Sequence, residues 1–470
     1  MKKKVAYFVG IKGVGMAPLA IYMKQAGFSV TGTDVSDRFI TDEVLEQAKI
    51  PILTNFLPSH ITRRTDVVIA TGAHGGKTNP EVRKALKLGI PVFMHGQMLG
   101  NIMSGKEGVA VSGCHGKTTT ASALAFLLST SGFDPSYSIG TSTIIGLGPA
   151  GHHGSGNIFI AEADEYMTCP VTDPTPRFLW QKPKMLIITN IEYDHPDAFP
   201  TFNDVKNAFL RLTENVDAKG TVIACIDNRH VRELLPFIKR NVVTYGFSKD
   251  ADFRIYSFSL LEGVSFMKVA NKTVEIAEFM LNIAGKHNML NLLAASVAAN
   301  FSGCSWEKIK ANIKNFQGSK RRFEKIEEVA DVLFYDDYAH HPSEIRATLA
   351  ACRNWYPKRY IIVLFQPHTF SRTKILFKEF ATSFSDCDEV IVTDIYPSAR
   401  EAFDPTISSK LLVAEIKKIK KQAMHLPGKV DAVAYLKKHY VPKSIVMTMG
   451  AGDIYKWHDD LIPMYKAVSL

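Results

Sequence analysis

The sequence predicts an α/β protein with largely parallel sheets, and three observations support this prediction. Short apolar runs alternate with helical patterns along most of the 470 residues. Glycine-rich turns follow two of these runs, at residues 10–15 and 113–116. The chain is also longer than a single core requires, since domains hold roughly 100–200 residues. We therefore expect three domains, over residues 1–106, 107–318 and 319–470.

The first block predicts a Rossmann-like domain. It reads as a strand at 5–9, a glycine-rich turn, a helix to about residue 25 and a strand at 29–33, with further strands at 67–71 and 91–94. A strand–turn–helix unit of this kind suits a diphosphate, because the first backbone N–H groups of a helix point at the ligand. Gly10, Gly13 and Gly15 lack the GxGxxG spacing of dinucleotide sites, so a nicotinamide cofactor is not expected.

The two later blocks repeat the alternation of strands and helices. The second has strands at 109–112, 158–162, 185–189 and 221–225 and ends after a helix that begins near His287. A charged, loop-like connector follows at 318–325. The third block has strands at 332–335, 360–365, 389–393 and 444–449, which predicts a second Rossmann-like domain.

Composition excludes several classes of protein. With 46% hydrophobic and 22% charged residues, the chain is globular rather than disordered. Its net charge of +10 is spread along the chain, and the densest run, KKIKK at 417–421, fits the solvated face of an amphipathic helix. No signature of nucleic-acid binding accompanies it. The six dispersed cysteines indicate a reducing cytoplasm, and no apolar run approaches the ~20 residues that cross a bilayer.

The strongest local signal is the stretch Gly113-Cys114-His115-Gly116-Lys117-Thr118, which follows an apolar run and precedes a small-residue helix from Thr119. Backbone N–H groups and a helix start form an anion cradle, Lys117 can reach the β- and γ-phosphates, and the Thr118 hydroxyl can bind Mg²⁺. The alternative is a plain glycine-rich turn, but the strand–loop–helix context favours a nucleotide. The central block is therefore predicted to be a P-loop ATPase domain.

Two acidic loops follow later strands of the same block. One is Ala-Glu162-Ala-Asp-Glu165, and the other spans 190–195 and ends in Asp194-His195. Because the carboxyl edge of an α/β sheet is where ligands bind, we expect these groups to form a site for Mg²⁺ or Mn²⁺ near the phosphates. Each loop alone could be a solvated acidic turn. A guanine-reading NKxD motif is missing, since Asn271-Lys272 has no following Asp.

Three further clusters contain polar residues that suit ligands. His287 and Asn291 are four residues apart at a helix start, where they could contact an adenine edge or cap the helix. Asp336-Asp337-Tyr-Ala-His340-His341 and Gln-Pro-His368-Thr-Phe-Ser-Arg372 each follow a strand of the third block. Two histidine-bearing loops at strand ends of one domain are more often ligand-facing than structural.

Taken together, the ordered motifs resemble the Mur ligase family, the ATP-dependent amide-forming enzymes of peptidoglycan precursor synthesis. They are the P-loop, NxxxDH at 190–195, GxHNxxN at 285–291 and DYAHxP at 337–342. Within the family, GIKGVGMAPLA, FQPHTFSRT and GAGDI resemble the branch that adds L-alanine. Lys12 and Cys114 replace the usual Gly and Thr. Residues 165–178 depart from that branch, and 162–166 and 195–199 look like the relative that attaches a ready-made tripeptide.

The resemblance implies that ATP activates the carboxylate of UDP-N-acetylmuramate as an acyl phosphate, which L-alanine then attacks, in a monomer or homodimer. The alternatives are the tripeptide-attaching reaction and a non-catalytic nucleotide-binding scaffold. Four residues are implied in catalysis, namely Lys117, Glu162, His195 and Arg322. Thr118, Glu162 and His195 would bind the metal. The residues implied at ATP are Gly113, Cys114, His115, Gly116, Lys117, Thr118, Thr119, His287, Asn288, Asn291, Arg322 and Asp337. Those implied at the UDP-sugar are Gly10, Gly13, Val14, Gly15, Met16 and Asp34, and those at the amino acid are His340, His341, His368 and Arg372.

Overall fold

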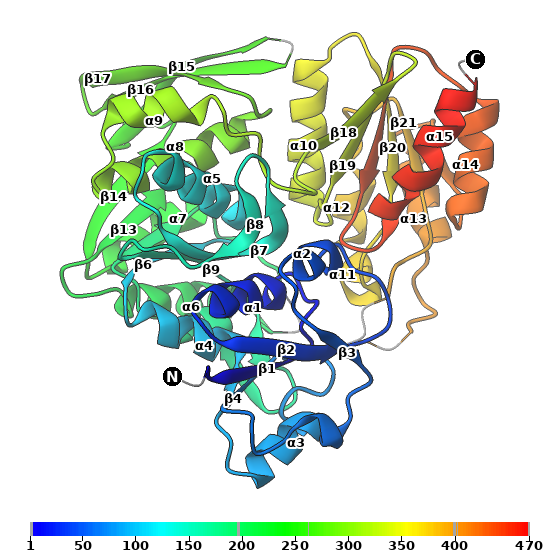
Figure 1. Cartoon of the computed structure of the whole chain (residues 1–470). Helices are drawn as coiled ribbons and strands as arrows, with labels where there is room; N and C mark the ends of the chain where they lie inside the picture. Colours follow the sequence, from blue (N-terminus) through cyan, green and yellow to red (C-terminus); the bar gives the residue numbers. More distant parts are fainter. Residues whose placement is uncertain (1–2, 195–197, 262, 398–400, 402, 469–470) are drawn as a thin grey trace. The chain divides into compact units, whose positions relative to one another are not determined.

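The structure is a computed structural model that describes residues 3–194, 198–261, 263–397, 401 and 403–468 (Figure 1). The chain divides into two compact units. The first comprises Met1–Ser259, Phe266–Asn282 and Asn288–Lys320, and the second comprises Leu260–Ser265, Ile283–His287 and Arg321–Leu470. No helix among the described residues is long and apolar enough to cross a membrane.

The first unit begins with a parallel five-stranded sheet of order β3-β2-β1-β4-β5. The predicted strands at 5–9, 29–33, 67–71 and 91–94 are confirmed to within two residues at either end. Strands and helices of this part are β1 (Val5–Val9), α1 (Met16–Gln25), β2 (Ser29–Asp34), α2 (Asp42–Gln47), β3 (Ile52–Thr54), β4 (Val67–Ala70), α3 (Pro80–Lys87), β5 (Val92–Met94) and α4 (His95–Met103).

A ten-stranded sheet completes the first unit, in the order β17-β16-β15-β14-β13-β12-β6-β9-β7-β8. The neighbours from β14 to β7 pair in parallel, whereas β7 and β8 form an antiparallel hairpin. Its strands are β6 (Glu107–Ser112), β7 (Ser136–Ile144), β8 (Gly148–His152), β9 (Ile158–Ala163), β12 (Met185–Ile188), β13 (Thr221–Cys225), β14 (Asn241–Gly246), β15 (Phe253–Leu261), β16 (Val264–Asn271) and β17 (Val274–Leu281).

The remaining elements of this part of the chain are a short hairpin and several helices. The antiparallel strands β10 (Met167–Cys169) and β11 (Asp173–Pro176) lie in the segment that departs from the expected family pattern. The helices are α5 (Lys117–Thr130), the 3₁₀ turn η3 (Arg177–Trp180), α6 (Phe202–Glu214), α7 (Arg229–Leu234), α8 (Lys286–Phe301) and α9 (Trp306–Ile313).

The two sheets of the first unit share one hydrophobic core. Helix α1 packs against β7 and β8 (Figure 1), and the Tyr22 and Phe159 rings meet edge to face with centroids 5.5 Å apart. The approach is close at Gly151, where an added Cβ would lie 1.9 Å from the Pro18 carbonyl oxygen. Side chains from β1, α1, β6, β9 and β12 belong to the same buried cluster.

The second unit is built on a six-stranded sheet of order β18-β19-β23-β20-β21-β22, in which only β18 runs antiparallel among the described strands. Separate apolar clusters cover the two faces of the sheet. Its strands are β18 (Glu324–Val329), β19 (Val332–Asp337), β20 (Tyr360–Phe365), β21 (Glu389–Val392), β22 (Ala423–His425) and β23 (Ser444–Met449). Its helices are α10 (Pro342–Trp355), α11 (Phe370–Ile375), α12 (Phe377–Ala381), α13 (Ser409–Ile416), α14 (Lys429–Lys438) and α15 (His458–Val468).

The lysine run at 417–421 does not lie on a helix, contrary to the sequence prediction. Helix α13 ends at Ile416, and Lys417 is its C-cap. Ile419, which would continue the apolar face, is 62% exposed. The chain turns between α13 and β22, which begins at Ala423. In this turn the Lys420 ammonium contacts the Cys387 carbonyl.

Candidate functional site

The loop between β6 and α5 has the geometry of a phosphate loop. Gly113 and Gly116 have φ values of +132° and +82°, which non-glycine residues rarely adopt. A Cβ on Gly113 would lie 2.0 Å from Thr189 Oγ1, and one on Gly116 would lie 2.4 Å from Asn291 Oδ1. Both positions therefore require glycine, and α5 begins directly after the loop, at Lys117.

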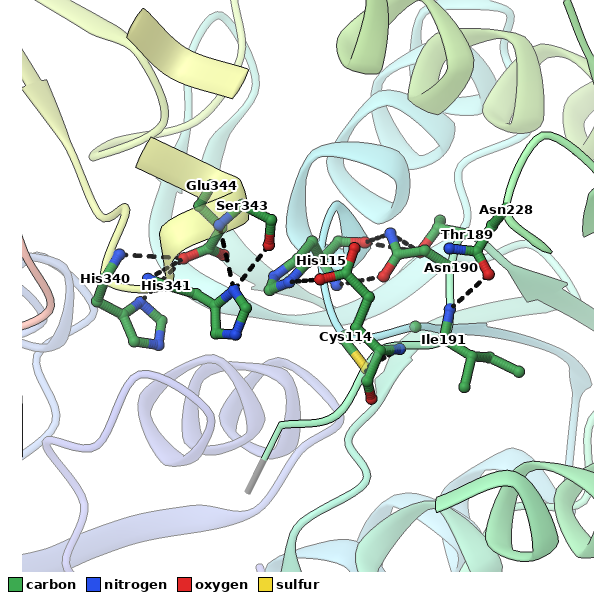
Figure 2. A network of polar contacts seen from close by, with 12 residues as sticks. Cys114, His115, Thr189, Asn190, Ile191, Asn228, His340, His341, Ser343 and Glu344 are labelled. Carbon is green, nitrogen blue, oxygen red and sulfur yellow. Dashed lines mark hydrogen bonds and ion pairs between the residues drawn. The ribbon is translucent and has the colours of Figure 1, made fainter. Parts of the chain in front are cut away.

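The segment directly after β12, the neighbour of β6 in the sheet, holds this loop in place (Figure 2). The His115 N–H donates to Asn190 Oδ1 at 2.9 Å, and the His115 carbonyl accepts from Asn190 Nδ2 at 2.8 Å and from Thr189 Oγ1 at 2.6 Å. The Cys114 thiol donates to the Glu192 carbonyl at 3.2 Å. Burial, together with the charges of Glu165 and Asp194, raises the pKa of this thiol. Cys114 is therefore a packed, protonated side chain rather than a nucleophile.

Lys117 is the largely buried cation of the loop. Its ammonium donates to the Gly113 carbonyl at 2.6 Å and lies 2.9 Å from Glu165 Oε2. Burial lowers the pKa of Lys117, but the charges of Glu165 and Asp164 outweigh burial, and the net shift is upward. The lysine thus stays protonated and can serve as a fixed positive charge.

Thr118 and Glu162 bring two oxygen ligands together. The Thr118 hydroxyl donates to Glu162 Oε2 at 3.1 Å, and Glu162 Oε1 accepts from the Gly140 N–H at 2.6 Å. Both side chains are buried. A hydroxyl and a carboxylate are hard ligands of the kind that Mg²⁺ prefers. His195, the third predicted ligand, lies outside the described residues.

The first glycine loop lies between β1 and α1. Gly10 and Ile11 donate their N–H groups to the Thr33 carbonyl. The buried Asp34 accepts the Lys12 N–H at 2.7 Å, so the loop and the carboxylate predicted at the UDP-sugar are in contact. Val14 is exposed beside the start of α1 at Met16, whereas Gly15 lies against His95, since a Cβ there would lie 3.1 Å from His95 Cε1.

Lys12, which replaces the expected glycine, has a structural partner. Its ammonium lies 3.1 Å from Asp42 Oδ1 and donates to the Asp37 carbonyl at 2.9 Å. The lysine thereby ties the first loop to the first residue of α2 and to the segment before it. The sequence marked Lys12 as a departure but did not identify this role.

Helix α8 carries the predicted adenine residues. Within the first unit, Asn291 Nδ2 donates to Asn288 Oδ1 at 3.1 Å, and Asn291 adjoins Gly116 of the phosphate loop. The two asparagines and the loop are therefore brought together. His287 is the second residue of α8 and belongs to the second unit, where its ring lies close to Gly285.

In the second unit, Asp337 ends β19 and is buried. Its carboxylate accepts the Phe323 N–H and the Ala339 N–H, each at 2.7 Å. Burial raises the pKa of Asp337 to about 7, against the opposing charge of Arg322. The guanidinium of Arg322 lies 5.0 Å from the centre of the Tyr338 ring.

Arg321, rather than Arg322, is the buried arginine of this connector. It lies 2.9 Å from Asp336 Oδ2 and donates to the Gly450 and Gly452 carbonyls at 2.5 and 3.1 Å. It fixes the start of the second unit to the end of β23. The sequence contains the adjacent pairs Arg321-Arg322 and Asp336-Asp337. No signal in the sequence tells which arginine of the first pair is buried.

The histidine loops of the second unit meet. The His340 and His368 rings lie edge to face with centroids 6.1 Å apart, and His368 stacks on Tyr396 at the same distance. His341 is the N-cap of α10, where its Nδ1 lies 2.7 Å from Ser343 Oγ, and Glu344 accepts the N–H groups of both His340 and His341 (Figure 2). His341 therefore has a capping role in the described contacts.

Arg372 is buried on the short helix α11, next to an unusual backbone position. Thr369, its N-cap, has a φ of +71°, and the threonine hydroxyl accepts the Arg372 N–H at 3.3 Å. Strained backbone of this kind persists where the surroundings determine it strongly, often at ligand sites.

The parallel sheet, the glycine-rich loop before α5 and the adjoining carboxylates define an α/β protein with a P-loop. Three family models match the chain: "Mur ligase family, catalytic domain" over residues 5–107, "Mur ligase middle domain" over 111–299, and "Mur ligase, glutamate ligase domain" over 321–452. The chain belongs to the Mur ligase family, which confirms the resemblance seen in the sequence.

Curated relatives match over nearly the full length of the chain. The UDP-N-acetylmuramate–L-alanine ligase of Desulfitobacterium hafniense is 40% identical over 460 residues, which is 97% of this chain and 99% of that one. The enzyme of the same name from Acetivibrio thermocellus is 39% identical over 459 residues, covering 97% and 95%.

Solved structures agree on the fold. The UDP-N-acetylmuramate–alanine ligase of Thermotoga maritima superposes with a TM-score of 0.80 at 24% identity, over 99% of this chain and 100% of that chain. A murein peptide ligase of Psychrobacter arcticus superposes with a TM-score of 0.73 at 23% identity, over 98% and 99%. The predicted α/β class is confirmed.

Proposed function

We propose that this chain is an ATP-dependent ligase that joins L-alanine to the carboxylate of UDP-N-acetylmuramate in peptidoglycan precursor synthesis. Relatives at 40% and 39% identity bear the name of this activity over nearly their whole length. The observation that carries the chemistry is the pairing at the start of α5, where Lys117 adjoins Glu165 and Thr118 adjoins Glu162.

The reaction brings two anions together. A carboxylate oxygen of the UDP-sugar attacks the γ-phosphorus of ATP, the bond to the β-phosphate oxygen breaks, and ADP leaves an acyl phosphate behind. The neutral amine of L-alanine then attacks the acyl carbon, phosphate departs with the C–O electrons, and the nitrogen releases a proton as the amide forms. Lys117 would offset the charge repulsion in the first step, since preorganised cations are the main device of phosphoryl transfer.

The oxygen ligands at Thr118 and Glu162 fit Mg²⁺, and His195 completes the proposed set. The bound ion would neutralise phosphate charge. Mn²⁺ accepts the same ligand types. The backbone around Gly140 holds Glu162 in place through the 2.6 Å hydrogen bond, so this carboxylate is already oriented.

The other predicted residues take their places in the same proposal. Gly10 to Met16 with Asp34 would hold the UDP-sugar, and the phosphate loop with Asn288 and Asn291 would hold ATP together with His287, Arg322 and Asp337. His340, His341, His368 and Arg372 would surround the amino acid. A cytoplasmic location and a monomeric or homodimeric state remain part of the proposal.

One specific observation favours a second candidate, the attachment of a ready-made tripeptide to the same sugar. Residues 165–178 depart from the L-alanine branch, and they fold into the separate β10–β11 hairpin and the start of η3. The sequence at 162–166 resembles the tripeptide-attaching relative. This alternative changes the amine and leaves the activation step as it is.

The deciding experiment measures phosphate release from ATP with UDP-N-acetylmuramate and Mg²⁺, while L-alanine, glycine, L-serine or the tripeptide is added in turn. Release with L-alanine, with the matching mass gain in the sugar nucleotide, is the expected result. Release only with the tripeptide would make the 165–178 segment the determinant of specificity. Binding of ATP without release for any amine would indicate a scaffold.

A further inference from the structure

Arg177 is a buried cation outside every motif of the family. It is the first residue of η3, directly after β11, and only 7% of its surface is exposed. Its N–H donates to the Tyr166 carbonyl at 2.9 Å, and its Nη1 donates to the Tyr166 hydroxyl at 3.2 Å. The guanidinium carbon lies 4.5 Å from the centre of the same ring. The side chain is therefore held in one place.

The charge of Arg177 has no anionic partner among the residues that the structure describes. Among those residues its side chain contacts Tyr166, and its buried Nε makes no hydrogen bond. A guanidinium does not give up its proton, and buried charges in proteins are nearly always paired. The contact with the Tyr166 ring compensates only part of the free-energy cost of burying this charge. A buried, oriented and unpaired guanidinium is what a site for an anionic ligand group requires.

The position of Arg177 links the two proposed substrate loops. On one side is His95, the first residue of α4, with Nε2 3.0 Å from the Gly15 carbonyl of the first glycine loop. On the other side, the Tyr166 hydroxyl donates to Asp164 Oδ2 at 3.1 Å, and the charge of Asp164 acts on Lys117 of the P-loop. Packing is tight at α4, where a Cβ on Gly96 would lie 3.1 Å from the Arg177 carbonyl oxygen.

His95 adds a hydrogen-bond acceptor next to this cation. Burial, reinforced by the charge of Arg177, lowers the pKa of His95 to about 3, so its ring is neutral at physiological pH. Because Nε2 faces a carbonyl oxygen, Nε2 carries the ring proton and Nδ1 is the acceptor. The buried Nδ1 has no hydrogen-bond partner among the described residues. A cation beside an acceptor suits a ligand that offers a carboxylate and a hydroxyl or amide N–H.

We propose that Arg177 binds the carboxylate of the UDP-linked sugar acid and that His95 accepts a hydrogen bond from the same sugar. This inference rests on the proposed function, in which the diphosphate occupies the Gly10–Gly15 loop and the carboxylate reaches the ATP phosphates at Lys117. Arg177 holds the carboxylate between the Gly10–Gly15 loop and Lys117. It thereby selects the sugar acid over the sugar nucleotide that lacks the acid.

The test compares two sugar nucleotides by titration calorimetry on the full chain. UDP-N-acetylglucosamine carries the same diphosphate as UDP-N-acetylmuramate but has no carboxylate. Arg177→Gln is expected to weaken binding of UDP-N-acetylmuramate at least about tenfold, as for loss of a charge-assisted hydrogen bond, and to change binding of UDP-N-acetylglucosamine less than about twofold. The matched control is Arg232→Gln, since Arg232 belongs to the same unit and pairs with Asp250 at the surface; it should change neither affinity.

Two outcomes overturn the proposal. Equal weakening for both nucleotides would assign the guanidinium to the diphosphate, and unchanged affinity for both would remove Arg177 from the site. A wild-type protein that does not bind UDP-N-acetylmuramate at all would refute the proposed function instead, so the two failures can be told apart.

Thermal melting tests whether the Arg177 variants have a folding defect. Because Arg177→Gln removes an unpaired buried charge, the variant without nucleotide is expected to melt no lower than the wild type, whereas the rise in melting temperature on adding UDP-N-acetylmuramate shrinks. Arg177→Lys, which keeps a charge but loses the planar fork, should show an intermediate loss of affinity. A variant that melts lower and binds UDP-N-acetylmuramate with unchanged affinity would show a purely structural arginine and contradict the proposal.

Discussion

The Lys117 ammonium and the Glu165 carboxylate form a largely buried ion pair at 2.9 Å, at the first turn of α5. The lysine that should receive phosphate charge is thus already paired with a protein carboxylate. Nucleotide phosphates would compete with Glu165 for the ammonium. The pair holds the side chain in place and keeps it protonated.

Glu165→Gln should therefore destabilise the protein, because it leaves the ammonium buried without its partner. Breaking one side of a buried pair costs about 3–5 kcal/mol, and urea denaturation should show a loss of this size. Added ATP should restore more stability to the variant than to the wild type, since its phosphates replace the missing charge. Glu107→Gln, which breaks an exposed pair with Lys184, is the control and should leave the denaturation midpoint unchanged. Equal midpoints for Glu165→Gln and the control would contradict the argument.

Lys117→Ala should abolish phosphate release. Removal of a preorganised charge from a phosphoryl-transfer site should cost roughly 10²–10³-fold in rate or more, by analogy with the loss of one oxyanion donor, which costs about 10²–10³-fold. Lys219→Ala, an exposed lysine of the same unit, provides the matched control for loss of a positive charge. Turnover that survives in Lys117→Ala would remove the P-loop from the mechanism.

Gly116→Ala should disrupt the phosphate loop beyond the ordinary cost of a left-handed residue. The backbone strain alone is about 1–2 kcal/mol, and the new Cβ would also lie 2.4 Å from Asn291 Oδ1. Gly132 has nearly the same φ, +87° against +82°, but open space around its Cβ position. Gly132→Ala should therefore show the strain without the clash. Calorimetric unfolding of both variants separates the backbone strain from the clash with Asn291. Equal losses of stability in the two variants would disprove the contact.

His95 should make stability depend on pH. Its folded pKa, about 3, lies below the ordinary value of 6.5, so the unfolded chain binds an extra proton between these two pH values. The free energy of unfolding should accordingly fall as the pH decreases from about 6.5 to about 3. His95→Gln removes this titration, so its stability should fall less steeply over the same range. Parallel pH profiles for the two proteins would show that His95 titrates normally.

Several strands of the parallel sheets could be predicted because they are largely apolar runs. Residues 360–365 and 444–449 form β20 and β23 at the predicted bounds. The hairpin of β7 and β8 was missed, since Gly, Ser and Thr dominate it and such residues form strands only through their neighbours. The strands from 241 to 281 were missed for a related reason, since their mixture of exposed and buried positions lacks a clear apolar run.

The P-loop could also be predicted, because its glycines, lysine and threonine are contiguous in the sequence. The partner of Lys117 could not, because it depends on strand order. Ser112 of β6 pairs with Ala163 of β9, and this register places Glu165 next to the loop. Nothing in the sequence predicts that Arg177 is buried or belongs to a site, since it follows a proline in a segment without a family motif. The predicted domain boundaries and ligand roles remain predictions.

The core shared by the two sheets of the first unit limits how this protein can be rearranged. Helix α1 follows β1 of the five-stranded sheet but packs on β7 and β8 of the ten-stranded sheet. A chimera that takes residues 1–106 from a distant relative would bring a foreign α1 against Gly151, where no room exists for an extra methyl group. The surface of α1 and the surface of the β7–β8 hairpin therefore have to fit each other. An exchange of the N-terminal part between relatives would require α1 and this hairpin to be exchanged together.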